Sequence, residues 1–493
     1  MSALISTWPR RMALAALTMM LAAIVMVELS MKFGPVPISE LTMGDWMKRL
    51  ILVPGLLAFV TFVFTTVVMQ TSARATNLEA EVQTKTVEAD PAESFMAQIV
   101  GLEWLNPLQR RDYPTEWQIL WTMGLVKPNQ NDDMVQTMPE KFASFGSIGA
   151  LVYGNHGTET FKGFYHKYVE ELLGKFGDRY ALNAKYFYTV KPDNKKDWRE
   201  LAGIHVEFAI PDRLDPLEAQ TYLRKKITSE FCIGSRGFPT LWSRDTPPDV
   251  HVTPGGPNAG FTSLNNALDY LQANPDKSVW VMNWDAPGFP PRDGQLNENM
   301  VLLFLAGPNF KTERAPLAWI GRAATGDVQS FERKVGTTRA VEAWKATIAQ
   351  AAHHANVPTT QIEHVIYDAG MGSEVSSERI GSLARTLTET LLEFDYQKQT
   401  FNTPRLLGDM GAGTALTNVV LAIGRANHFG ETVLVAGTTD ADHPVAVVVT
   451  PPPQVVPIDP NADWFRARGE NNAYLPWWGR RYDSKYGMQG FSW

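Results

Sequence analysis

Short apolar runs alternate with segments of helical spacing from about residue 95 to about residue 450, and no other feature of the sequence constrains the fold as much. We expect strands at residues 147–153, 203–210, 278–283, 300–306, 364–367, 432–436 and 445–449. We expect helices at residues 164–176, 262–274, 339–355, 376–392 and 412–428. Alternation of this kind is typical of layered α/β proteins. The sequence therefore predicts an α/β body.

Two long apolar runs precede this body, at residues 12–27 and 50–69. The second holds about 20 residues, which in a helix match a hydrocarbon core of about 30 Å. We therefore predict a membrane anchor with two transmembrane helices in residues 1–71. Arg10 and Arg11 before the first run favour a cytoplasmic N-terminus, and two spans then place the body in the cytoplasm. The shorter first run also fits a cleaved signal peptide, and this alternative stays open.

The remaining chain divides by composition. We expect an acidic linker at residues 72–94, an N-terminal α/β domain at 95–335 and a C-terminal α/β domain at 336–450. Residues 451–493 begin with three prolines and are rich in aromatic side chains, which predicts an extended arm. Its rings either pack onto the body or bind a partner. If they bind a partner, we expect the contacts at Trp477, Trp478, Arg480 and Arg481, because aromatic and arginine side chains anchor interfaces.

Charge and cysteine content narrow the function. The 52 acidic and 45 basic residues give a formal net charge of −7, which disfavours nucleic acid as a partner. Cys232 is the only cysteine, so an intrachain disulfide and a cysteine-based zinc site are excluded. The sequence lacks the hydrolase elbow, the nucleotide-binding P-loop and the zinc-protease helix motif. Asp440, Asp442 and His443 fit a capped loop better than a cation site. We expect no cofactor and no metal.

Two stretches of the body share one template. The first runs through residues 257–268 into a helix and continues at 278–287, and the second runs through 346–368 and 407–413 into a helix and a final pair of strands. This pattern resembles the thiolase-like fold of the β-ketoacyl synthases over residues 252–450. The resemblance implies a layered body of two related halves. It also implies a reaction centre of one cysteine, at the start of a helix, and two histidines.

The positions that match those three catalytic groups are Gly260, Asp368 and Asp409. A glycine cannot act as a nucleophile, and carboxylates repel a developing oxyanion instead of stabilising it. The resemblance therefore predicts degenerate catalytic positions and no enzymatic activity. If the register differs, Cys232 is the only thiol that could serve as a nucleophile. An acyl-transferring or lipid-binding thiolase-like protein of acyl metabolism is the alternative.

The whole chain resembles the type VI lipase adapter protein family of Gram-negative bacteria. The features that carry this resemblance are two N-terminal apolar runs, an acidic linker, a ketosynthase-like body without its catalytic groups, and an aromatic end that reads YLPWWGRRYDSKYG. The resemblance implies a non-enzymatic adaptor that binds a phospholipase effector and delivers it to the spike of the type VI secretion system. It further implies a two-pass protein of the bacterial inner membrane with a cytoplasmic body, and it leaves a homodimer open.

Overall fold

The computed structural model divides the chain into two units, residues 1–92 and 93–493, and the second unit contains the α/β body. The structure describes residues 94–106, 115–128, 130, 133–137, 139, 160–176, 204–231, 247–288, 297–310, 316–370, 374–391 and 394–458, together with 20, 21, 24, 25, 27 and 28. Within this part of the chain, no helix is both long and apolar enough to cross a membrane. The two predicted membrane helices lie almost entirely outside the described residues, as does the predicted linker.

The first half of the body forms a five-stranded section of sheet. Its strands are β1 (Ala97–Leu105), β2 (His205–Ile210), β3 (Asp249–Pro254), β4 (Ser278–Asp285) and β5 (Asn299–Ala306). Their order across the sheet is β3-β2-β4-β5-β1. Strand β2 runs parallel to β3 and β4, whereas β5 runs antiparallel to β4 and β1.

The second half repeats this arrangement. Its strands are β6 (Ala318–Ile320), β8 (Ile362–Tyr367), β9 (Thr400–Asn402), β10 (Thr432–Gly437) and β11 (Val445–Thr450), in the order β9-β8-β10-β11-β6. Strand β8 is parallel to β9 and β10, as β2 is to β3 and β4. Strand β11 is antiparallel to β10 and β6, as β5 is to β4 and β1. The short strand β7 (Ala324–Thr325) pairs with β11. The expected thiolase-like body of two related halves is confirmed.

Strands β1 and β6, the first strand of each half, join the halves into one sheet. They pair antiparallel, with Ala97 opposite Ile320 and Ile99 opposite Ala318. The described strands therefore form a continuous sheet of eleven.

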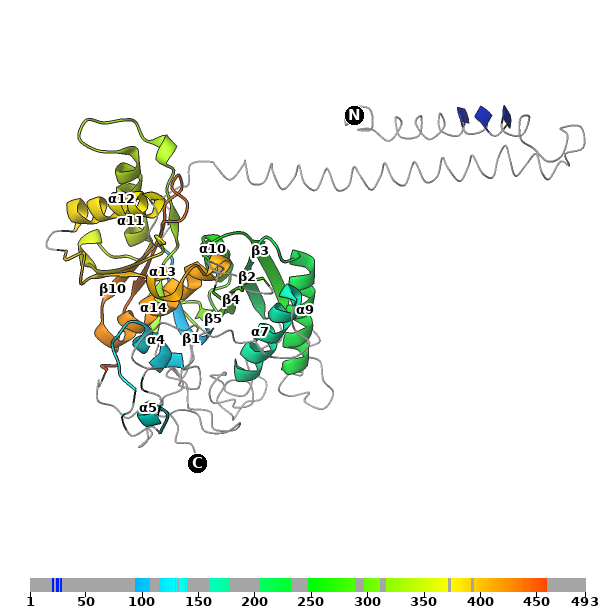
Figure 1. Cartoon of the computed structure of the whole chain (residues 1–493), viewed down its shortest axis with the longest axis horizontal. Helices are drawn as coiled ribbons and strands as arrows, with labels where there is room; N and C mark the ends of the chain where they lie inside the picture. Colours follow the sequence, from blue (N-terminus) through cyan, green and yellow to red (C-terminus); the bar gives the residue numbers. More distant parts are fainter. Residues whose placement is uncertain are drawn as a thin grey trace, which may run out of the picture. The chain divides into compact units, whose positions relative to one another are not determined.

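Helices cover both faces of this sheet (Figure 1). They are α4 (Thr115–Thr122), α5 (Asp133–Thr137), α7 (Phe161–Phe176), α9 (Pro216–Glu230), α10 (Ala259–Ala273), α11 (Arg339–His354), α12 (Glu374–Thr390), α13 (Pro404–Leu407) and α14 (Thr414–Phe429), with 3-10 turns η6 (Val328–Ser330), η7 (Thr359–Gln361) and η8 (Gly411–Gly413). Local sequence sets several of their ends. Asp215 accepts a hydrogen bond from the backbone N–H of Glu218 at the start of α9, and Thr338 does the same for Val341 in α11.

The second half is buried on both faces of its strands. In β10, Val433 and Val435 pack into the core that contains α14, while Leu434 and Ala436 pack into the core that contains α11 and α12. Such alternation follows from the two-residue period of a strand. Helix α14 is itself buried around nearly its whole circumference, with only Arg425 and Phe429 reaching the surface. A helix buried on all sides lies in the middle of a protein, and α14 lies there, beside α10 (Figure 1).

The predicted elements with strong periodicity are confirmed: β2, β4, β5, β8, β10 and β11, and α7, α10, α11, α12 and α14. The strand expected at 147–153 lies outside the described residues. Strands β1, β3, β6 and β9 and helix α9 were not predicted. They complete the repeat, which therefore begins at β1 and not at residue 252 as expected.

We predict that Ile320→Ala lowers the free energy of unfolding of the body by about 2–5 kcal/mol, because truncation of a fully buried side chain leaves a cavity. Ile320 is 0% exposed and lies opposite both Ala97 of β1 and Val449 of β11. Denaturant unfolding followed by tryptophan fluorescence measures the change. As a control, Val335→Ala alters a fully exposed aliphatic side chain and should change stability by less than about 0.5 kcal/mol. Equal effects of the two variants would contradict the assigned packing.

Candidate functional site

Helices α10 and α14, which occupy the same place in the two halves, meet at their N-terminal ends. Gly260 is the second residue of α10, and Ala415 is the second residue of α14. A Cβ atom at Gly260 would lie 2.9 Å from the Cβ of Ala415 and 3.2 Å from the Cγ of Leu416. The glycine is therefore required by the close approach of the two helices. The position where the ketosynthase resemblance would place a nucleophile is filled by the opposite helix.

Asparagine side chains continue this interface on either side. The side-chain oxygen of Asn258, just before α10, lies against the α-carbon of Gly437 at the end of β10. The side-chain amide of Asn299, at the start of β5, lies against the α-carbon of Gly413. Asn283 of β4 donates through Nδ2 to the carbonyl of Gly413 at 2.7 Å. The start of each central helix is thus packed against strand ends of the other half.

Asp368 lies directly after β8, and its carboxylate is buried. Oδ1 accepts hydrogen bonds from the backbone N–H of Thr438 at 2.6 Å and from its hydroxyl at 3.0 Å, and Oδ2 accepts one from the Thr439 hydroxyl at 3.0 Å. Burial raises the pKa of Asp368, although the three hydrogen bonds act in the opposite direction. These bonds attach the end of β8 to the turn that follows β10, so this carboxylate has a structural role.

Asp409 lies in the exposed turn before η8. Its Oδ1 accepts a hydrogen bond from the backbone N–H of Gly411 at 2.9 Å, and its carbonyl accepts one from the backbone N–H of Asn297 at 2.7 Å. Within the described residues, no hydrogen bond or ion pair joins Gly260, Asp368 and Asp409 to one another. Each is held in a separate structural contact.

Asp285, at the end of β4, is a second buried carboxylate, and it attaches the two halves to each other. Its Oδ2 accepts a hydrogen bond from the backbone N–H of Ala412 at 3.0 Å, and its Oδ1 forms an ion pair with Arg213 at 2.8 Å. Burial raises the pKa of Asp285, while Arg213 opposes the shift. This carboxylate holds the turn before α14 against the first half.

A protein-family model matches most of the second half. Residues 324–451 match the family model described as "Type VI lipase adapter protein Tla3, C-terminal". This match confirms the resemblance to the type VI lipase adapter family for that part of the chain. The matched segment runs from β7 to the end of β11 and so includes both α11 and α12 and the central helix α14. No curated protein matches the sequence.

Several solved ketosynthase structures are similar to the chain. The ishigamide ketosynthase/chain length factor has a TM-score of 0.43 and 14% identity, over 72% of this chain and 99% of that one. The ketosynthase from module 6 of the bacillaene synthase from Bacillus subtilis 168 has a TM-score of 0.46 and 10% identity, over 72% of each chain. Because these TM-scores lie below 0.5, the thiolase-like assignment rests on the repeated strand order.

Other predicted site residues fall in different places. Cys232, Trp477, Trp478, Arg480 and Arg481 lie outside the described residues. Asp440 caps its own loop, since Oδ1 accepts hydrogen bonds from the backbone N–H groups of Asp442 and His443 and Oδ2 lies 3.0 Å from Nδ1 of His443. The expected capping role of this loop is confirmed.

Sequence reasoning missed one group of ionisable residues, His205, Glu207, Asp249 and His251. Their side chains meet on one face of the paired strands β2 and β3. The signal in the sequence is the pair of alternating triplets His-Val-Glu at 205–207 and Asp-Val-His at 249–251. It was overlooked because β3 was not predicted, and without β3 the two triplets have no reason to be neighbours.

We predict that Gly260→Ala destabilises the body by about 1–3 kcal/mol, because the added methyl group overpacks the contact with Ala415. This cost outweighs the roughly 1 kcal/mol that alanine normally gains over glycine inside a helix. Adding Ala415→Gly to this variant should recover most of the loss, because it removes the contacting Cβ. Gly381→Ala is the matched control, since Gly381 is an exposed residue of α12 with no atom within 4 Å of an added Cβ. That control should leave stability unchanged or raise it, and a loss equal to that of Gly260→Ala would refute the packing argument.

We predict that Asp368→Asn removes a component of the pH dependence of stability. The folded-state pKa of Asp368 lies above its ordinary value of 3.8. The contribution of Asp368 to the free energy of unfolding is therefore fully present below pH 3.8 and is lost as the pH rises through the folded-state pKa. The amide keeps the oxygen that accepts from Thr438. As the pH is raised from about 4, the midpoint denaturant concentration of the wild type should therefore fall relative to that of the variant. Asp409→Asn, at an exposed carboxylate, is the control. If the difference in denaturant midpoint between Asp368→Asn and the wild type did not change with pH, the assignment would be contradicted.

Proposed function

We propose that this protein is a membrane-anchored, non-enzymatic adaptor that binds a phospholipase effector and delivers it to the spike of the type VI secretion system. The observation that carries the proposal is the match of residues 324–451, nearly the whole second half of the body, to the lipase adapter family. A lipase is the partner that this family implies. Delivery to the spike, the two-pass inner-membrane anchor, the cytoplasmic body and a homodimer belong to the proposal, since they rest on the sequence resemblance and the charge pattern alone.

The packing of the body supports a binding role over acyl transfer. A ketosynthase-like reaction needs space for a thiolate at the start of α10 and imidazoles around it. Here the helix start at Gly260 abuts Ala415, and the Asp368 carboxylate is occupied by threonine donors. Neither alternative, an acyl-transferring enzyme that uses Cys232 or a lipid-binding protein without chemistry, finds support in these contacts.

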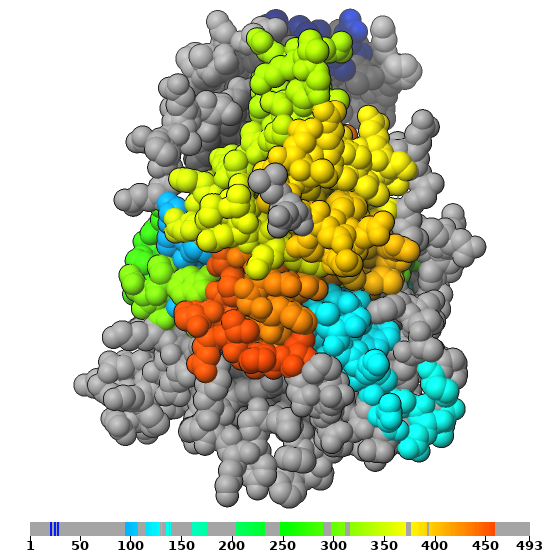
Figure 2. Space-filling model, turned by 90° about the vertical axis from the view of Figure 1, so that its left-hand side faces the viewer, coloured from blue at the N-terminus to red at the C-terminus, as the bar shows by residue number. Residues whose placement is uncertain are grey.

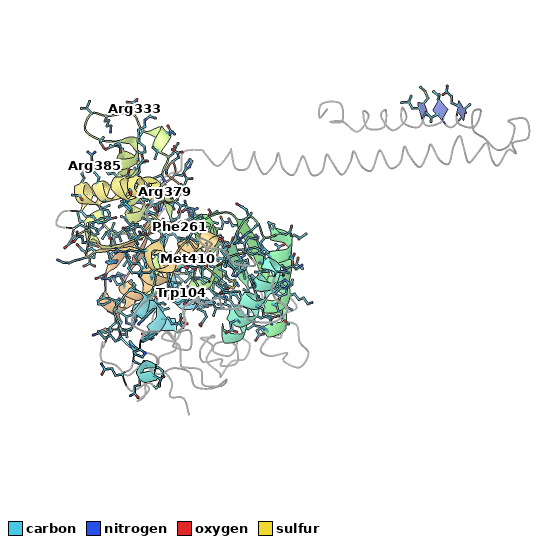
Figure 3. All side chains as sticks on the ribbon, in the orientation of Figure 1. Trp104, Phe261, Arg333, Arg379, Arg385 and Met410 are labelled. Atoms are coloured by element: carbon cyan, nitrogen blue, oxygen red, sulfur yellow. The ribbon has the colours of Figure 1, made fainter. Side chains whose placement is uncertain are left out.

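We place the lipase-binding surface on the outer face of the second half, formed by α11, α12 and the loop at residues 331–338 (Figure 2). This loop is largely exposed, and Arg333 and Arg385 extend from this end of the body, whereas Trp104, Phe261 and Met410 are buried in its interior (Figure 3). The face lies within the segment that matches the adapter family. Arginine side chains are enriched among the residues that anchor protein interfaces.

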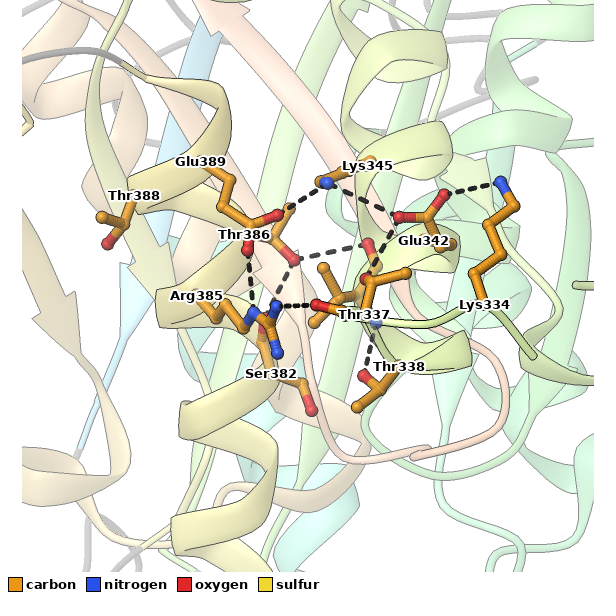
Figure 4. A network of polar contacts seen from close by, with 12 residues as sticks. Lys334, Thr337, Thr338, Glu342, Lys345, Ser382, Arg385, Thr386, Thr388 and Glu389 are labelled. Atoms are coloured by element: carbon orange, nitrogen blue, oxygen red, sulfur yellow. Dashed lines mark hydrogen bonds and ion pairs between the residues drawn. The ribbon is translucent and has the colours of Figure 1, made fainter. Parts of the chain in front are cut away.

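Ion pairs hold this surface in one conformation before any partner binds (Figure 4). Glu342 pairs with Lys334 at 3.1 Å, and Lys345 pairs with Glu389 at 2.7 Å. Arg385 pairs with Glu389 and also donates to the carbonyl of Gly336, which attaches the loop to α12. Each exposed pair adds little stability. Their combined effect is to fix the loop, and a preformed surface loses less entropy on binding.

The test is co-purification of the full chain with its lipase from native cells, in detergent. We expect the wild-type protein to recover a lipase together with a spike component. Reversal of an exposed charge on the proposed surface, in the variant Arg333→Glu, should reduce lipase recovery at least about tenfold, as mispaired charges cost an interface several kcal/mol. Lys225→Glu, an equally exposed change on α9 of the first half, is the control. Recovery of acyl carrier protein in place of a lipase would overturn the adaptor proposal, and full lipase capture by the surface variant would overturn the placement of the surface.

A further inference from the structure

The outer edge of the first half brings together two histidines and two carboxylates. Strands β2 and β3 run parallel, with His205 opposite Asp249 and Glu207 opposite His251. Alternate residues of a strand point to the same side, so all four side chains lie on one face. One ligand atom from each of His205, Glu207 and His251 lies within 4.8 Å of the others, the one such group among the described residues.

Two carboxylates approach the ring of His205. Its Nε2 lies 2.8 Å from Oε1 of Glu207, and its Nδ1 lies 3.1 Å from Oδ2 of Asp249. A neutral imidazole has one N–H donor and one acceptor nitrogen, so it satisfies only one of these carboxylates. The side chains of His205 and Glu207 are 8% and 6% exposed, and a buried carboxylate without a cationic partner is costly. A divalent cation between the imidazoles and the carboxylates would balance the two negative charges.

We propose that His205, Glu207 and His251 form a binding site for a divalent transition metal of the Zn²⁺ class. Two imidazole nitrogens and one carboxylate oxygen are a ligand set that Zn²⁺ prefers, with a remaining position open to solvent. The two carboxylates, Glu207 and Asp249, match the charge of one divalent ion. This inference is independent of the adaptor function.

Neighbouring residues already orient these ligands. The ring of His205 stacks on Tyr270 of α10, with centroids 3.9 Å apart and planes inclined by 7°. Asn266, one turn earlier on α10, donates through Nδ2 to Oε2 of Glu207 at 3.4 Å, which leaves Oε1 directed at His205. Asp249 accepts from Nδ1 of His205, the contact that typically fixes the tautomer of a metal-binding histidine. A hydrogen-bonded outer shell of this kind accompanies most metal sites.

The geometry needs only a small adjustment to accept the ion. Zinc-to-ligand distances of about 2.0–2.2 Å place tetrahedral donor atoms about 3.3–3.5 Å apart. Nε2 of His205 and Oε1 of Glu207, which are 2.8 Å apart, would separate slightly to admit the ion. The side chain of His251 is 51% exposed and its Nε2 lies 2.9 Å from Oδ2 of Asp249. Rotation of His251 away from Asp249 would bring its ring nitrogen to the ligand atoms of His205 and Glu207. The metal would then link the edge strand β3 to β2.

The test measures metal binding by the detergent-solubilised full chain without a polyhistidine tag. Zn²⁺ is titrated in competition with a chromophoric chelator, and Co²⁺ is added separately to read the coordination from its visible absorption. We expect one Zn²⁺ per chain, Co²⁺ bands of a four- or five-coordinate site, and a rise in the melting temperature with Zn²⁺. Asp249→Asn should weaken binding about 10–100-fold, as loss of an outer-shell partner does, and His251→Ala should abolish stoichiometric binding.

Two further variants keep the result interpretable. Glu207→Gln removes the buried ligand charge, but because it can also disturb folding, His251→Ala at the half-exposed position is the decisive change. His443→Ala is the matched control, because His443 pairs with Asp440 at 3.0 Å on an exposed loop and should contribute nothing. No stoichiometric binding by the wild type would overturn the proposal. Binding that survives in His251→Ala would overturn it as well.

Discussion

The antiparallel contact between β1 and β6 is the interaction on which the rest of the body depends. Each half has its first strand at one side of its own section of sheet, where an unpaired edge would expose backbone donors and acceptors. Pairing the two first strands removes both edges at once and makes a single sheet from two repeats. It also brings α10 and α14 together, so that the starts of these helices become the centre of the molecule. The packing at Gly260 follows from that geometry.

The centre created in this way is used for structure. Asp368 attaches β8 to the turn after β10, Asp285 attaches β4 to the turn before α14, and asparagines press against glycines of the opposite half. In a condensing enzyme such a place would need room for substrate. Here the same elements form close contacts between the halves. The segment that matches the adapter family, residues 324–451, supplies one side of these contacts.

The sequence predicted strands that are continuous apolar runs and helices with a clear apolar stripe, and it missed elements that show neither signal. Strands β6 and β9 have three residues each, too few for a period to show. Helix α9 buries only Ala219, Leu223 and Ile227 among largely polar neighbours, so its apolar stripe is narrow. Gly260 was correctly placed at the start of a helix, but the reason for a glycine, the approach of Ala415, depends on a contact between residues far apart in the chain. The group at His205 was invisible for the same reason, since its members come together only when β2 and β3 pair.

The position of β1 in the sheet also governs the order in which the chain can fold. Its partners are β5 and β6, whose residues 299–306 and 318–320 lie some 200 positions further along the sequence. At a synthesis rate of about 5–20 residues per second, β1 waits for about 10–40 s before either partner leaves the ribosome. Throughout that interval a nine-residue strand that is buried along its whole length in the finished protein must be kept from wrong partners. Late closure of the first strand is therefore built into this topology, whereas the strands of the second half lie closer together in the sequence.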